Sequence, residues 1–342
     1  AANLADLLVE DLAGGSDELR QRVPVLLEDL VSRGKLMQVG EEYRLQTRES
    51  AEWEADFRNR RARIHADDSR LASHRATELR KVFTAATRGL AFTQGASRTK
   101  RDFALFFEGG APPSNSESVP VWVRNEWDTS EATVRAEAQR AGTDSPIVFV
   151  FLPRRDADAL KDRLASFAAA QETIQTRPAP ATPDGIEARN AMSSRTDAER
   201  RHLDALTQQI IGGGRIFAGG GNEITEGSLD ASLRLAVEGA LDRLFPDFTL
   251  ADHAGWDRVF TRASTGAQDA LTAVGYNGEV EQHPVCRLVR QFVGVAGKRG
   301  LEVRQKFKGE GYGWPQDAVD GALLALVSVG CVNARRNGQP VR

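Results

Sequence analysis

Residues 119–123 read Val-Pro-Val-Trp-Val, and residues 146–152 read Pro-Ile-Val-Phe-Val-Phe-Leu. The second run is wholly apolar, which is typical of a strand that is covered on both faces, as in a parallel sheet. Residues 130–141 lie between the two runs and have the pattern of a helix, so the whole segment predicts a βαβ unit. Two further strands, joined by a basic loop at 98–101, are expected at residues 90–93 and 103–107. Together these elements predict a small α/β domain at residues 89–155.

Both ends of the chain have the pattern of a winged-helix unit, in which helices precede a small hairpin. A first apolar stripe consists of Leu4, Leu7, Leu8 and Leu12. A second stripe consists of Val23, Leu26, Leu27, Leu30 and Val31. Gly34 is placed to cap this second helix, and the alternating residues on either side of Gly40-Glu41-Glu42 predict a hairpin. We therefore expect a winged-helix-like domain at residues 1–48.

The same pattern returns at the other end. Residues 326–332 (Leu-Val-Ser-Val-Gly-Cys-Val) echo residues 30–36 (Leu-Val-Ser-Arg-Gly-Lys-Leu). Pro315 predicts the first position of the preceding helix, and Asn337-Gly338 is a two-residue hairpin signal. We expect residues 298–342 to form a second winged-helix-like unit with a truncated wing.

The segments between these units are mainly helical. Residues 49–88 contain no Gly or Pro and predict a linker helix. Residues 156–225 predict a helical arm with a glycine-rich hairpin, in which two triple-glycine runs form flexible turns around a short strand at 215–217. Residues 226–297 predict a helical domain. The expected fold class is mixed α/β and mostly helical, with winged-helix-like units at both ends around a small βαβ region and helical arms.

Composition narrows the class of protein. The 342 residues include 45 basic and 48 acidic side chains, a net charge of -3, which excludes a uniformly basic nucleic-acid coat protein. The longest strongly apolar run, at 147–152, is far shorter than the roughly 20 residues that span a bilayer, and the N-terminus has no signal-peptide pattern. Two cysteines cannot form a disulfide framework, so we expect a reduced, cytoplasmic protein with no membrane partner. Both ends interrupt an element, so we expect a piece of a longer polypeptide.

Catalytic and metal-binding motifs are not found. The nearest approach to a nucleotide-binding loop is Gly294-Val295-Ala296-Gly297-Lys298-Arg299, which is shorter than Gly-x-x-x-x-Gly-Lys-Ser/Thr and lacks the hydroxyl that binds magnesium. The five histidines and two cysteines form no cluster with the spacing of metal ligands. We therefore expect no catalytic residue, no metal and no cofactor in this chain.

Charge is unevenly distributed near the C-terminus. Residues 226–283 hold 10 acidic and 4 basic side chains, whereas residues 284–342 hold 4 acidic and 10 basic ones, a net charge of +6. Clustered cations are typical of nucleic-acid binding. The candidate DNA-binding residues are Arg20, Arg22, Arg33 and Lys35 in the first winged unit and Arg335 and Arg336 in the second. Because Glu41 and Glu42 at the first wing tip repel phosphate, the second unit is favoured.

The ends of the two central strands offer a second candidate site. Ligands of open parallel sheets bind beyond the carboxyl ends of the strands. Here those ends carry Arg124, Arg154 and Arg155, which predict an anion-binding site, with a solvated surface as the alternative. Glu126 and Asp128 are the nearest carboxylates, so a degenerate nuclease or nucleotide-binding core is an alternative function for this region.

Distinctive blocks occur at 141–153 (Ala-Gly-Thr-Asp-Ser-Pro-Ile-Val-Phe-Val-Phe-Leu-Pro) and 312–318 (Tyr-Gly-Trp-Pro-Gln-Asp-Ala). Together with residues 22–24, 30–36, 43–49, 120–124 and 252–256, they resemble the large P-loop ATPase component of BREX phage-defence systems, the BrxC/PglY family. The resemblance extends over nearly the whole chain but includes no catalytic motif.

This resemblance implies an ATPase domain upstream of the chain, with ATP and magnesium bound by the full-length protein. The resemblance does not indicate what this segment contacts; the candidate partners are DNA, other BREX subunits and further copies of the protein. The expected function is a non-catalytic scaffold that joins DNA and partner subunits. The alternatives are the degenerate enzyme domain described above and a purely protein-binding assembly module.

Overall fold

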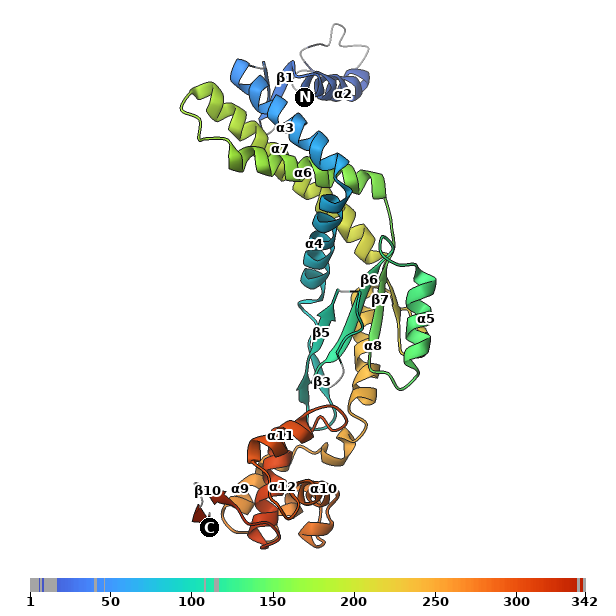
Figure 1. Ribbon diagram of the computed structural model, residues 1–342, viewed down its shortest axis with the longest axis vertical. Helices are drawn as coiled ribbons and strands as arrows, with labels where there is room; N and C mark the ends of the chain where they lie inside the picture. Colours follow the sequence, from blue (N-terminus) through green and yellow to red (C-terminus); the bar gives the residue numbers. More distant parts are fainter. Residues whose placement is uncertain are drawn as a thin grey trace. The chain divides into compact units, whose positions relative to one another are not determined.

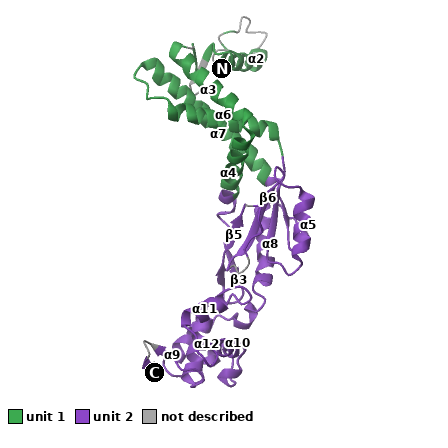
Figure 2. Cartoon of the chain, viewed as in Figure 1, with its two compact units in different colours: residues 1–83, 155–211 green, residues 84–154, 212–342 purple. Residues whose placement is uncertain are grey.

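The computed structural model describes residues 6, 8, 17–39, 42–45, 47–107, 109–113, 117–336 and 339–340. The chain divides into two compact units, of which unit 1 contains residues 1–83 and 155–211 and unit 2 contains residues 84–154 and 212–342 (Figure 2). Most described residues are helical and the strands are few, so the predicted mixed α/β, mostly helical class is confirmed. Within these ranges, none of the helices has both the length and the apolar composition of a membrane span.

Unit 2 contains a sheet whose described strands follow the order β5-β6-β7-β8-β9 (Figure 1). They are β5 (Phe103–Phe106), β6 (Val119–Asn125), β7 (Val148–Leu152), β8 (Arg215–Phe217) and β9 (Glu223–Ile224). The first three are parallel, and α5 (Glu131–Ala141) connects β6 to β7, which confirms the predicted βαβ unit. β8 and β9 then add antiparallel to β7. Residues 212–225, predicted as part of the helical arm, therefore belong to the unit that contains the sheet.

Helices cover both faces of this sheet. Trp122, Phe149 and Phe217 point to one face, where they form a core cluster with Val134 and Ala138 of α5. Neighbouring residues along each strand point to the opposite face, where α8 (Leu229–Leu244) contacts β6, β7, β8 and β9. All residues of β7 are buried, so its uninterrupted apolar sequence follows from cover on both sides.

Close packing explains the second triple-glycine run. Gly220 and Gly221 have φ of 88° and 82°, values in the left-handed region that side chains rarely adopt. A Cβ at Gly219 would lie 2.6 Å from the carbonyl oxygen of Gly142 and 2.7 Å from that of Ser145. The glycines therefore let the β8–β9 turn lie directly on the loop that follows α5.

The expected basic loop at 98–101 is largely a strand. It belongs to a hairpin made of β3 (Phe92–Gln94) and β4 (Thr99–Arg101). The turn amides of Ala96 and Ser97 each donate a 2.8 Å hydrogen bond to the carboxylate of Asp252. Arg101 is buried and donates a 2.6 Å hydrogen bond to the carbonyl of Gly313. Burial lowers the pKa of Arg101 to about 10. The hydrogen bonds to Asp252 and Gly313 hold the hairpin against the helices that follow.

These following helices form the C-terminal part of unit 2. They are η1 (Phe248–Ala251), α9 (Trp256–Ser264), η2 (Ala270–Val274), η3 (Val280–Gln282), α10 (Pro284–Val293), α11 (Gly300–Lys308) and α12 (Gln316–Ser328), followed by β10 (Arg335–Arg336) and β11 (Gln339–Pro340). One hydrophobic core contains Trp256 of α9, Cys286 of α10, Phe307 of α11 and Ala322 of α12. Residues 226–297 and 298–342, predicted as separate domains, thus both contribute to this core.

In unit 1, α2 (Asp17–Ser32) precedes a hairpin of β1 (Leu36–Val39) and β2 (Glu42–Leu45). Gly34 has a φ of 68°, as expected of a C-terminal cap. Val23 and Leu27 are buried against the hairpin. Leu26 and Leu30 are 55% and 38% exposed. The apolar stripe of α2 is therefore only partly buried in the described structure.

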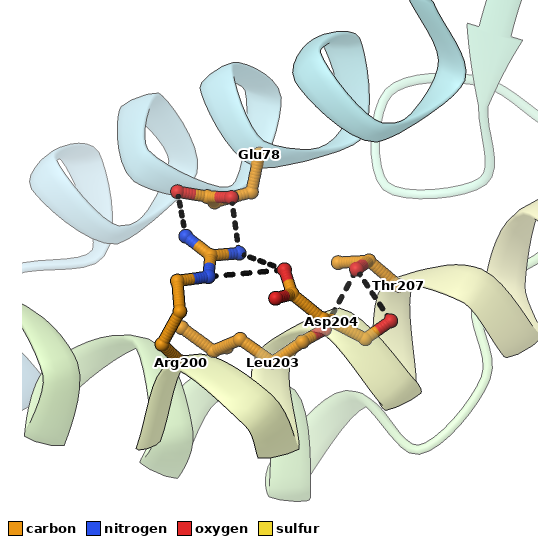
Figure 3. Close-up of polar contacts among 5 residues, drawn as sticks. All are labelled: Glu78, Arg200, Leu203, Asp204 and Thr207. Atoms are coloured by element: carbon orange, nitrogen blue, oxygen red, sulfur yellow. Dashed lines mark hydrogen bonds and ion pairs between the residues drawn. The ribbon is translucent and has the colours of Figure 1, made fainter. Parts of the chain in front are cut away.

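Longer helices make up the rest of unit 1. They are α3 (Arg48–Ala66), α4 (Asp68–Thr87), α6 (Ala157–Thr176) and α7 (Pro183–Gly212). The predicted linker helix at 49–88 is two helices, of which α3 packs along α6. Arg200 of α7 donates to both carboxylate oxygens of Glu78 in α4, at 2.8 and 2.7 Å, and also to Asp204 at 2.6 Å (Figure 3). Bidentate hydrogen bonds between arginine and a carboxylate are strong and directional, so this pair holds α4 against α7.

Candidate nucleic-acid interface

An open groove of about 1400 Å³ lies in the C-terminal part of unit 2. It is lined by α10, the loop at 294–299, the start of α11 and residues 331–335. Gly294, with a φ of 59°, ends α10 and begins the loop. Gly330, with a φ of 76°, follows α12 and turns the chain into the segment that forms the other side of the groove. The glycine-rich stretch that resembled a nucleotide-binding loop is therefore one wall of an open groove.

Cations dominate the described lining of this groove. It contains five basic side chains, Arg287, Arg290, Lys298, Arg299 and Arg335, against the two carboxylates Glu281 and Glu302. Arg290 forms an ion pair with Glu281. Within the part of the chain that the structure describes, the other four cations are exposed and form no ion pair. Lys298 lies over the ring of Phe292, with its Nζ 5.7 Å from the ring centroid.

The size and charge of the groove fit an extended anion. Small-molecule sites are usually concave cavities of about 300–1000 Å³ with mainly apolar walls. This groove is larger, open and lined by unpaired cations, so it suits a chain of phosphates, each of which interacts with one or two side chains. The exposed cations also raise the local concentration of a polyanion through long-range attraction, an effect that salt screens.

The structure brings one of the two predicted C-terminal residues into the groove. Arg335 lines it, next to Asn333. Arg336 pairs with Gln339 through the backbone of β10 and β11, but its side chain lies outside the described set. The predicted Asn337-Gly338 turn also lies outside the described residues.

The candidate residues of the N-terminal unit are balanced by carboxylates. Arg20 pairs with Asp6 at 2.9 Å, Arg22 with Glu18 at 3.0 Å and Arg33 with Asp29 at 2.8 Å. The pairs of Arg22 and Arg33 join residues one turn apart, within α2 and at its C-terminal end, as expected for acidic and basic side chains at i and i+4. The fourth candidate, Lys35, is exposed. Because the charges of the three arginines are compensated locally, we expect this surface to attract phosphate weakly. Glu41, expected at the wing tip, lies outside the described residues.

The predicted anion site at the strand ends is not assembled around Arg124. Its guanidinium donates to Glu137 of α5 at 3.2 Å and lies 4.9 Å from the centre of the Trp122 ring. The pleat of β6 explains this position, since Arg124 shares the α5 face with Trp122. The side chains of Arg154 and Arg155 are exposed, and these two residues belong to different units.

The carboxylates near the same strand ends stabilise loops. Glu126 accepts a 2.7 Å hydrogen bond from the backbone amide of Arg154. Asp128 accepts a 2.6 Å hydrogen bond from the side-chain amide of Asn125. Among the described residues, no group of three or more His, Cys, Asp or Glu side chains is arranged to hold a metal ion.

Sequence reasoning missed four of the basic residues of the groove. Arg287, Arg290, Lys298 and Arg299 were not among the candidate DNA contacts, although all four lie in the segment with a net charge of +6. That charge was the signal that pointed to this region. It could not show which cations remain unpaired, because their partners depend on how η3, α10 and α11 pack.

Comparisons with known proteins gave no relatives: the chain matches no family model, no curated protein and no solved structure.

Proposed function

We propose that the chain is a non-catalytic scaffold segment that binds nucleic acid through the groove in the C-terminal part of unit 2. One observation carries the proposal: Arg287, Lys298, Arg299 and Arg335 line the same groove without ion-pair partners among the described residues. Phosphates would replace the counterions of these side chains, and counterion release is the main driving force of nonspecific nucleic-acid binding. Contacts of this kind position a nucleic acid without reading its sequence.

The wider setting rests on the resemblance to the large ATPase of BREX phage-defence systems. We propose that the chain acts within such a cytoplasmic ATPase, where ATP and magnesium are bound by another part of the polypeptide. The scaffold would then hold DNA at the groove and hold other BREX subunits, or further copies of the protein, at other surfaces.

Fluorescence anisotropy with a labelled DNA duplex tests the groove. The affinity should fall as salt rises from about 0.02 to 0.2 M, with a log–log slope near -3.6 if four phosphates are contacted. A second protein carries Arg287→Gln, Lys298→Gln, Arg299→Gln and Arg335→Gln. Its affinity for the duplex should be much lower, and its log–log salt slope should be much closer to zero.

The matched control is a variant with Arg20→Gln, Arg22→Gln, Arg33→Gln and Lys35→Gln, which removes the same charge from the N-terminal unit. It should retain nearly all of the binding, because three of these residues are already paired with carboxylates. Equal losses in the two variants would contradict a specific role for the groove. Absence of wild-type binding at the lowest salt would refute the function itself.

A protein-binding assembly module is the second candidate, and a separate surface favours it. Val25, Leu26 and Leu30 of α2 and Leu45 of β2 are exposed apolar side chains in unit 1. Exposed apolar patches often mark protein contacts. If they do so here, a Leu26→Ser, Leu45→Ser variant should sediment with less self-association than the wild type, or bind its partner subunits less tightly, while DNA binding stays unchanged.

A further inference from the structure

Glu281 lies in the proposed groove between two hydrogen-bond donors. Its carboxylate pairs with the guanidinium of Arg290 and accepts a hydrogen bond from the thiol of Cys331, with 3.6 Å between Sγ and Oε2. The residue belongs to η3, which is anchored by the buried side chain of Val280. Arg290 comes from α10, and Cys331 comes from the segment after α12. The carboxylate therefore sits where three separate segments meet at the groove.

The pair of Glu281 and Arg290 is accessible from solvent. The two side chains are 38% and 50% exposed, respectively. Exposed ion pairs of this kind contribute little to stability, so replacing one partner should leave the fold intact. Arg290 also lies one turn from Arg287 on the same face of α10, and Arg287 is one of the unpaired cations of the groove. Arg290 is thus a fifth potential phosphate ligand that a carboxylate of the protein already occupies.

We propose that Glu281 is an internal competitor for phosphate: its carboxylate stays paired with Arg290 and so withholds this cation from the backbone of a nucleic acid in the groove. The inference rests on the proposed function, since it assumes that the groove binds nucleic acid. It adds a residue that limits affinity: the carboxylate repels an incoming phosphate and withholds one cation. Removing its charge while keeping its shape strengthens binding and adds one phosphate contact.

Glu281→Gln is the variant that tests this directly. The glutamine oxygen can still accept a hydrogen bond from Cys331, so the local structure is preserved. Duplex affinity at about 0.05 M salt should rise roughly fivefold, the effect of removing one like charge about 4 Å from a phosphate in water. The log–log salt slope should become steeper by about 0.9, because Arg290 then neutralises one more phosphate.

Glu302→Gln is the matched control in the same groove. Glu302 accepts a hydrogen bond from the backbone amide of Arg299 at 3.0 Å and pairs with no cationic side chain among the described residues. Its replacement removes the same charge without releasing an arginine. Affinity should therefore rise, but the salt slope should stay at the wild-type value.

Arg290→Gln completes a double-mutant cycle. In the wild-type background it should change affinity less than twofold, because Arg290 is engaged by Glu281. In the Glu281→Gln background it should abolish the added slope and weaken binding, leaving only the gain that comes from removing the carboxylate charge. Circular dichroism and thermal melting of each variant establish that it is folded.

The outcomes separate the two proposals. If the wild type binds DNA in a salt-dependent manner but Glu281→Gln leaves the slope unchanged, the competitor role is wrong and the groove remains the binding site. The same conclusion follows if Arg290→Gln weakens binding equally in both backgrounds. If the wild type does not bind DNA, both proposals fail.

Discussion

Protonation of His283 should destabilise the C-terminal core of unit 2 as the pH falls below 6.5. The imidazole is 8% exposed and packs edge-on against Trp256 and Tyr276, with ring centroids 5.5 and 4.9 Å away. Its Nδ1 accepts a 3.3 Å hydrogen bond from the backbone amide of Val285, so the residue caps α10 in its neutral form. A protonated ring cannot accept this bond.

The magnitude follows from the pKa. Burial lowers the pKa of His283 from 6.5 to about 4. A folded-state pKa below the unfolded value means that the unfolded chain binds the proton more readily, so stability is full above pH 6.5 and is lost progressively as the pH falls toward 4. Since each pKa unit corresponds to about 1.36 kcal/mol, the loss is about 2 kcal/mol at pH 5 and about 3 kcal/mol at pH 4.

Comparison with His283→Asn isolates this effect. The asparagine oxygen can cap α10 in the same way but does not titrate. The free energy of unfolding is measured in urea at pH 7 and at pH 5, with the fluorescence of Trp256 and Trp314 in this core as the probe. The difference in this free energy between wild type and variant should change by about 2 kcal/mol between the two pH values. The carboxylates and the other histidines are common to both proteins, so their titration cancels.

An NMR titration measures the pKa itself, with the variant identifying the His283 resonance among the five histidines. A pKa near 6.5 in the folded protein, or equal pH dependence of the two proteins, would refute the reasoning.

Two predictions concern packing and pairing. Gly219→Ala should lower the free energy of unfolding by about 2 kcal/mol, because its Cβ would meet two backbone oxygens of the 142–145 loop. In the control Gly212→Ala a Cβ meets nothing within 4 Å, so the melting temperature should change little. Arg200→Ala should lower the free energy of unfolding by about 1–3 kcal/mol, because it leaves Glu78 without its two hydrogen bonds. Arg200→Lys should not restore this stability, because lysine lacks the planar guanidinium group that bonds to both carboxylate oxygens. The control Arg22→Ala removes an exposed ion pair, and its free energy of unfolding in urea should stay within about 0.5 kcal/mol of the wild-type value. An equal effect of Arg22→Ala and Arg200→Ala would contradict the assigned role of Arg200.

Local pattern determined much of the fold from the sequence alone. The apolar run at 146–152, the helix before it and the strand before that predicted the parallel pair of β6 and β7, because a strand covered on both faces must be apolar at every position. Ser130 caps α5 and Gly34 ends α2, as these residue types do for reasons that lie within one helical turn. The net charge of residues 284–342 likewise pointed to the segment that contains the groove.

Tertiary structure decided everything that depends on partners distant in sequence. β8 joins β7 after an insertion of two long helices, and no local pattern encodes that pairing. Gly219 was expected in a flexible turn, yet its backbone packs against residues more than 70 positions earlier. The same holds for charge: Arg287 and Arg290 look alike in the sequence, but Arg290 pairs with Glu281 of η3 and Arg287 forms no ion pair in the described structure. Whether a cation is free to bind phosphate depends on which acidic side chains the fold places beside it, and composition contains no information about that distance.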